Sequence, residues 1–118
     1  MTNFLLKTVE PLLKAALEGG SNHWYVTTES NIDYLRKMFP ITFNSEVPFY
    51  PEGYLAIQDK YGFLEYPEIL NIHKLLNGLI QLKRTFPSHY YRFQRHDYDS
   101  RTADIYLQLC LFNEIIFD

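Results

Sequence analysis

The chain is organised around the stretch Asp97-Tyr98-Asp99-Ser100-Arg101-Thr102-Ala103-Asp104-Ile105-Tyr106-Leu107-Gln108, where a polar, acidic run passes into a strongly apolar helix. Asp99 and Ser100 both have side chains suited to cap the first turn. The predicted helix runs to about Asn113. Its buried side is expected to comprise Ile105, Leu109 and Phe112, widened by Leu107, Cys110 and Leu111. So apolar a helix is expected at the centre of the core or in a dimer interface.

Hydrophobic spacing, turn residues and prolines predict the remaining elements. Helices are predicted over residues 3–18, 31–39 and 67–86, and strands over 23–27, 41–43, 54–59 and 63–65. Residues 88–96 are expected to form a loop or an irregular strand. The order predicts one α+β domain over residues 1–118. In it a small antiparallel sheet packs against an N-terminal helix, a long central helix and the apolar C-terminal helix.

Two glycine positions carry structural expectations. Gly19 and Gly20 follow the first predicted helix and are expected to end it, because glycine adopts the left-handed closing conformation at little cost. Gly78 lies in the middle of the long predicted helix, where close helix packing is the favoured interpretation and room for a ligand or a partner chain the alternative.

Composition limits the class of protein. The chain has 118 residues and a net charge of −3, which disfavours non-specific nucleic-acid binding. Ten Tyr, nine Phe and one Trp indicate an aromatic core, with some rings left for a binding or oligomer surface. The lone Cys110 excludes an intramolecular disulfide and fits a buried position. The start of the chain does not resemble a signal peptide and no run reaches transmembrane length, so a cytosolic protein without a membrane partner is expected.

Signatures of catalysis are absent from the sequence. It has no hydrolytic nucleophile motif, no phosphate-binding glycine loop and no metal-ligand spacing among its histidines. We therefore expect no enzyme activity, no catalytic residue, no metal and no cofactor. Two alternatives stay open: a hard-metal cluster of His96, Asp97, Asp99 and Asp104, and an enzyme acting through Asp99, Asp104 and His96. Helix capping and solvation explain these acids more simply.

A basic and aromatic run precedes the last helix. Lys83, Arg84, Arg92, Arg95 and Arg101 stand against Asp97 and Asp99, a local charge of +3 in an acidic chain, and they alternate with Tyr90, Tyr91, Phe93 and Tyr98. Guanidinium groups bind phosphates in a bidentate manner, and aromatic rings stack on bases. The run therefore suits a nucleotide or a short single strand. The alternative is a surface segment whose arginines pair with the protein's own carboxylates.

A second candidate segment lies near the start, at Glu18-Gly19-Gly20-Ser21-Asn22-His23-Trp24-Tyr25. Glycine lets the backbone approach a neighbour closely. In a strand, Trp24 and Tyr25 point to opposite faces, so one is expected in the core and the other free for contact. The two segments form one site only if this strand lies against the last helix, as we expect.

Residues 16–25, together with residues 99–108 and 111–115, resemble a family of small bacteriophage proteins. That family pairs a Glu-Gly-Gly segment before Tyr-Trp with a C-terminal Asp…Thr-Ala-Asp…Gln…Phe-Gly-Glu segment. This chain departs from the pattern at His23, where Tyr is expected, and at Asn113, where Gly is expected. Asn tolerates the left-handed conformation, so the helix stop is preserved. The resemblance implies a phage protein that acts in the host cytoplasm.

Together these observations predict a non-catalytic phage protein that counteracts host antiviral defence by binding and sequestering a nucleotide-derived immune signal. In logic it resembles the anti-Thoeris and anti-CBASS sponges. The arginines are expected to bind phosphates and the rings to stack, within the predicted ligand-binding set of Trp24, Tyr91, Arg92, Arg95, Tyr98, Arg101, Thr102 and Asp104. The alternative is an anti-CRISPR-like inhibitor that binds a host defence protein directly. We expect no sequence-specific nucleic-acid partner, and we expect a homo-oligomer that covers the apolar last helix.

Overall fold

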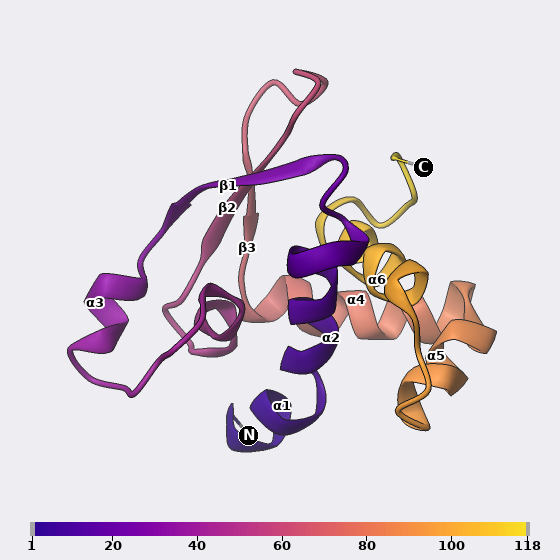
Figure 1. The fold of residues 1–118 in the computed structure, drawn as a ribbon, viewed down its shortest axis with the longest axis horizontal. Coiled ribbons are helices and arrows are strands. Elements are labelled where there is room, and N and C mark those ends of the chain that lie inside the picture. Colours follow the sequence, from indigo (N-terminus) through magenta and orange to yellow (C-terminus); the bar gives the residue numbers. More distant parts are fainter. Residues whose placement is uncertain (1, 118) are drawn as a thin grey trace.

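The computed structural model describes residues 2–117 and has the expected α+β architecture, with a three-stranded antiparallel sheet beside several helices (Figure 1). The strands are β1 (Tyr25–Ser30), β2 (Leu55–Asp59) and β3 (Glu68–Leu70), in the order β1-β2-β3. In the register, Tyr25 lies opposite Asp59 and Leu55 lies opposite Leu70, with a bulge in β1 between Thr27 and Glu29. The loop between β2 and β3 extends beyond the rest of the sheet (Figure 1).

The remaining elements of residues 2–117 are helical. They are α1 (Thr2–Thr8), α2 (Glu10–Ala15), a π-helical turn η1 (Ala16–Gly20), α3 (Ile32–Arg36), a 3-10 helix η2 (Asn44–Phe49), α4 (Ile72–Thr85), α5 (Pro87–Gln94) and α6 (Ser100–Phe112). None of the helices in residues 2–117 combines the length and the apolar character that crossing a bilayer requires.

Helix α6 is the centre of the core, as the sequence predicts. Its residues from Thr102 to Leu111 are all buried, and α2, η1, β3, α4 and α5 pack around it. The Asp99 carboxylate caps its start by accepting the backbone N–H of Thr102 at 3.0 Å, and Asn113 ends it with a φ of 61°. Because the chain itself covers α6, this helix does not need a second copy of the protein to bury its apolar side.

Close packing also explains Gly78. This residue faces Cys110 across the contact between α4 and α6, and a Cβ atom there would collide with the Cys110 side chain. The Tyr106 hydroxyl crosses the same contact and donates to the Leu75 carbonyl at 3.0 Å. The preferred interpretation of a glycine in the long helix is therefore confirmed.

Several element boundaries were predicted wrongly. Residues 88–96 are mostly helical, because Pro87 occupies the first turn of α5, where its missing N–H is harmless. Residues 63–65 lie in a loop and the third strand is formed by 68–70 instead, while residues 41–43 are not a strand. The predicted helix over residues 3–18 is divided at Val9, and α2 begins at Glu10 with Pro11 in its first turn, which is one of the two outcomes that a proline in this pattern allows.

Candidate functional site

The N-terminal segment and the last helix meet, as predicted, and they meet in the core. Asp104 on α6 accepts hydrogen bonds at Oδ1 from the Ser21 hydroxyl at 2.7 Å and from the Trp24 indole N–H at 2.8 Å. We name Asp104, Ser21, Trp24 and Gln108 the Asp104 cluster. All four residues are buried, so the cluster is a closed hydrogen-bonded junction.

Gln108 extends the cluster to the C-terminal tail. Its amide N–H group donates to Asp104 Oδ2 at 3.1 Å and to the Phe117 carbonyl at 2.6 Å. Its oxygen accepts the backbone N–H groups of Ile116 and Phe117, each at 2.8 Å. The Phe117 ring stacks on Trp24 with centroids 4.7 Å apart. Gln108 of α6 therefore holds the C-terminal tail in place, with the Phe117 ring stacked on the Trp24 indole.

Close approach, and not the left-handed conformation, explains Gly20. Neither Gly19 nor Gly20 has a positive φ, so the expected closing conformation is wrong. A Cβ atom on Gly20 would collide with the Ser100 carbonyl at the start of α6, whereas one on Gly19 would meet open space. Gly20 is therefore needed to seat η1 directly on α6.

Three of the predicted ligand-binding residues are buried and stabilise the fold. Trp24 and Thr102 have no exposed surface, and Asp104 is 3% exposed. The Thr102 hydroxyl lies 2.7 Å from His89 Nδ1, and Asp99 Oδ1 accepts it at 3.2 Å. The polar groups of these three residues are already used within the fold, and no ligand reaches them in this conformation.

The other predicted residues lie on or near the surface of α5 and the start of α6. Arg92 donates to the Asp97 carbonyl at 3.0 Å and to the Asp99 carboxylate at 3.3 Å, which is the pairing that the alternative interpretation expects. Arg95 donates to the Tyr91 hydroxyl at 2.7 Å, and its guanidinium carbon lies 5.2 Å from the centroid of that ring. Arg95 is exposed, whereas Arg92 is half-buried.

The last two members of the predicted set lie on either side of the helix cap. Tyr98 is half-buried, with its ring centroid 6.2 Å from that of Phe93, and burial followed by the nearby Glu10 carboxylate raises its pKa. Arg101 is exposed in the first turn of α6. The eight predicted residues are thus divided between the core and the surface and do not line one pocket.

Asp99 and Asp104, two of the acidic residues in residues 97–108, have different structural roles. Asp99 caps α6, and the donated N–H of Thr102 holds its pKa below the usual value, with Arg92 adding to the effect. Asp104 is turned into the core towards Ser21 and Trp24. Over residues 2–117 no group of three or more His, Cys, Asp or Glu side chains is placed to hold a metal ion, so the metal-cluster alternative is not assembled.

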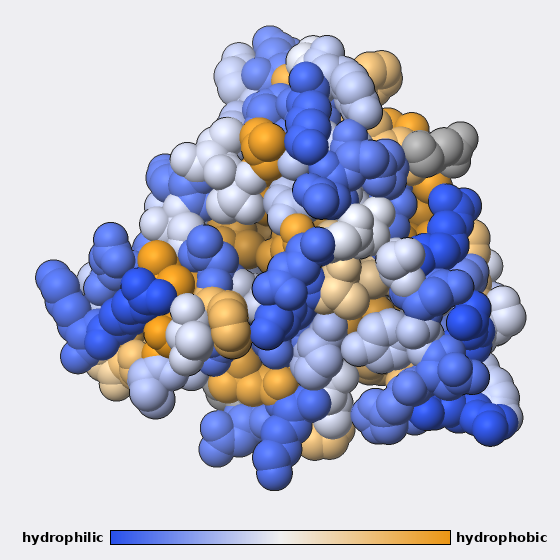
Figure 2. All heavy atoms as spheres, in the orientation of Figure 1, coloured by the Kyte–Doolittle hydropathy of each residue, from blue (hydrophilic) through white to orange (hydrophobic). Residues whose placement is uncertain are grey.

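A pocket does form beside the basic run, where the sequence placed none. A hollow of about 300 Å³ lies between α1, α4 and α5, lined by Phe4, Leu5, Thr8, Val9, Leu79, Tyr90, Phe93, Gln94 and His96. We name it the α5 pocket. Its walls are mainly apolar and aromatic, and Figure 2 shows hydrophilic side chains gathered over α5 at the lower right of the molecule.

Two features concern residues that line the α5 pocket, Tyr90 and His96. The Lys83 ammonium lies 5.8 Å from the centroid of the Tyr90 ring, which places a positive charge at the aromatic wall. His96 has a φ of 56°, a left-handed conformation that is uncommon for a residue other than glycine. The sequence contained a signal for this pocket in the spacing of Tyr90 and Phe93, which share one face only if residues 87–94 are helical.

No protein-family model, no curated protein and no solved structure matches this chain. The resemblance to small bacteriophage proteins therefore stays a hypothesis.

Proposed function

We propose that this chain is a non-catalytic phage protein that counteracts host antiviral defence in the host cytoplasm by sequestering a nucleotide-derived immune signal, and that the α5 pocket receives its base. The observation that supports this best is the combination of ring-lined walls with a cation at the rim. Bases stack on aromatic side chains, and basic groups beside them attract phosphates.

The surroundings of the α5 pocket agree with this role. Tyr90 and Phe93 supply ring faces on one side, and the 64% exposed Phe4 supplies a third ring from α1. Arg95 stands between the lining residues Gln94 and His96 and is exposed, so it joins Lys83 as a candidate phosphate ligand. The proposed site therefore lies at the α5 pocket and not at Trp24 and Asp104, which are buried in the core.

Isothermal titration with a panel of cyclic dinucleotides and cyclic ADP-ribose isomers tests the proposal. We expect saturable heat with at least one compound and a loss of affinity of about tenfold in Lys83→Glu, since one charge-assisted contact contributes about that factor. Lys37→Glu, an exposed lysine at the end of α3, is the matched control and should bind like the wild type. Absence of heat with every compound would refute the proposal.

A second candidate, direct inhibition of a host defence protein, is favoured by the loop between β2 and β3. Tyr61, Phe63 and Tyr66 are 68%, 72% and 72% exposed there. Asp59 holds this loop by accepting the backbone N–H groups of Tyr61, Phe63 and Leu64 at 3.2, 2.8 and 2.9 Å. Although burial opposes the effect, these donated groups hold the pKa of Asp59 below its usual value. Rigidly presented rings are typical anchors of protein interfaces.

A pull-down from host lysate separates the two candidates. If the loop is the inhibitory surface, the wild type recovers one stoichiometric host protein, Phe63→Ser loses it, and Phe4→Ser at the α5 pocket keeps it. The nucleotide proposal predicts the reverse sensitivity in titration, with Phe4→Ser weakened and Phe63→Ser unchanged. Equal recovery by the wild type and Phe63→Ser would eliminate the loop as the contact surface.

A further inference from the structure

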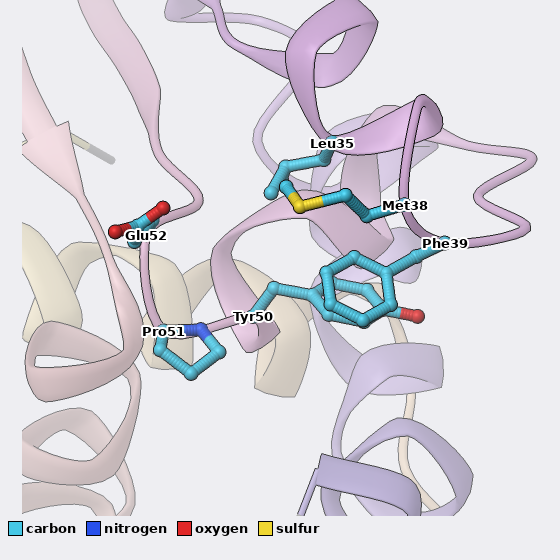
Figure 3. Close-up of a pocket in the computed structure, with 6 residues that line it drawn as sticks. All are labelled: Leu35, Met38, Phe39, Tyr50, Pro51 and Glu52. Atoms are coloured by element: carbon cyan, nitrogen blue, oxygen red, sulfur yellow. The ribbon is translucent and has the colours of Figure 1, made fainter.

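A second hollow, beside α3 and thus at the other end of the molecule from α5 (Figure 1), has a different chemical character. It measures about 260 Å³ and lies between α3 and the segment that follows η2 (Figure 3). Its lining residues are Leu35, Met38, Phe39, Tyr50, Pro51 and Glu52. We name it the α3 pocket. Five of these six side chains carry no charge, and the sixth is a carboxylate.

The walls offer ring faces and adaptable apolar surface. Phe39 stacks on Tyr50 with centroids 4.5 Å apart and an interplanar angle of 29°. Leu35 is 1% exposed, whereas Met38 is 53% exposed and presents a flexible thioether. In Figure 3 the ring pair and Glu52 lie on opposite sides of the hollow. A ligand between them would touch a π face and a carboxylate together.

Glu52 is held in place without a cationic partner. Its carbonyl accepts the Asn31 amide at 2.8 Å, and its Oε2 accepts the Tyr34 hydroxyl at 3.3 Å. The ion pairs found within residues 2–117 do not include Glu52. The nearby Arg36 directs its guanidinium to the carbonyls of Ile41 and Thr42, each at 3.1 Å. A negative charge at an apolar hollow is thus left available.

We propose that the α3 pocket binds an apolar monocation, either a free alkyl or aryl amine or the methylated ammonium of a lysine side chain. The apolar body would lie against Leu35 and Met38, and the ammonium would face both the ring pair and Glu52. Cations are attracted to the faces of aromatic rings, and a carboxylate adds a charge-assisted contact. The same carboxylate repels anions, so this pocket and the α5 pocket select ligands of opposite charge.

Carbon-13 methionine-methyl NMR tests this assignment, with Met38 as a reporter in the pocket wall. Phenethylamine is the free-amine probe, acetyl-trimethyllysine amide is the side-chain probe, and phenylpropionate is the anion of similar shape. We expect at least one cation to shift the Met38 signal saturably, and we expect phenylpropionate to bind at least about tenfold more weakly. Which cation binds more tightly identifies the source of the ligand.

Two variants separate the contributions. Glu52→Gln should weaken the cation about tenfold and remove the preference over phenylpropionate, whereas Glu65→Gln in the β2–β3 loop should leave both unchanged. Phe39→Leu keeps an apolar wall but removes a ring face, and should weaken the trimethylated probe. The proposal is overturned if neither cation shifts the Met38 signal, if phenylpropionate binds as tightly, or if Glu52→Gln binds like the wild type.

Discussion

Replacement of Asp104 by alanine should lower the free energy of unfolding by about 3–6 kcal/mol. The Asp104 carboxylate receives hydrogen bonds from Ser21, Trp24 and Gln108 in a closed part of the core. Removing it leaves three buried donors without an acceptor. An unsatisfied buried donor costs about 1–3 kcal/mol, and partial local relaxation is expected to hold each of these three to about 1–2 kcal/mol. Since a domain of this size is stabilised by about 5–15 kcal/mol, the variant should be marginally folded.

Urea denaturation followed by tryptophan fluorescence measures this effect directly, because Trp24 is the single tryptophan and a member of the Asp104 cluster. Asp104→Asn should be intermediate, at about 1–3 kcal/mol. Its new amide would face the Gln108 amide, and Gln108 cannot turn over without releasing the N–H groups of Ile116 and Phe117. The control Asp97→Ala, at an exposed position, should lie within about 0.5 kcal/mol of the wild type.

The opposite pattern would contradict the assignment. If Asp104→Ala unfolds within about 0.5 kcal/mol of the wild type but loses ligand binding, Asp104 is a binding residue and the Asp104 cluster is not a structural junction.

Three further expectations concern stability and reactivity. Gly20→Ala should destabilise the fold by about 1–3 kcal/mol because its Cβ meets the Ser100 carbonyl, whereas Gly19→Ala should be close to neutral in the same denaturation assay. Burial raises the pKa of Cys110 to about 12, so the thiol should not react with Ellman's reagent at pH 8 until denaturant is added; rapid reaction of the folded protein would show that α6 is open. The pKa of Asp99 is lowered in the folded protein, so on acidification the unfolded chain binds a proton at this carboxylate first. The contribution of Asp99 to the free energy of unfolding should therefore be full above the usual pKa of 3.8 and fall as the pH drops through and below that value. An equally steep loss of stability with acid in Asp99→Asn would exclude this carboxylate as the cause.

Local chemistry explains which parts of the fold could be predicted. Helix α6, its Asp99 cap and its Asn113 stop follow from turn residues and apolar spacing, and Gly78 follows from the needs of helix contact. The boundary between α4 and α5 could not be predicted with the same certainty. Pro87 serves equally well as the end of one helix and as the first turn of the next, and tertiary packing decides between them.

The candidate site was harder to predict than the helices because long-range packing determines it. The sequence indicated correctly that Gly20 and Trp24 meet the last helix. It did not indicate that Phe117 of the tail closes this contact, held by Gln108 of α6. The α5 pocket depends on α1 lying against α4 and α5, which is a long-range contact without a local signal. Residue type thus predicted the chemistry of the basic run, whereas packing determined which of its side chains line a pocket.

Mapping a bound nucleotide onto the surface shows whether the α5 pocket is the nucleotide site. In amide NMR spectra recorded during titration with the cyclic nucleotide that shows the largest calorimetric response, we expect saturable shifts centred on Tyr90, Phe93 and His96. We also expect Lys83→Glu to weaken the binding that these shifts report, and the signals of the α3 pocket to stay unchanged. No shifts, or shifts centred on the β2–β3 loop or on Glu52, would contradict the claim that the α5 pocket is the nucleotide site.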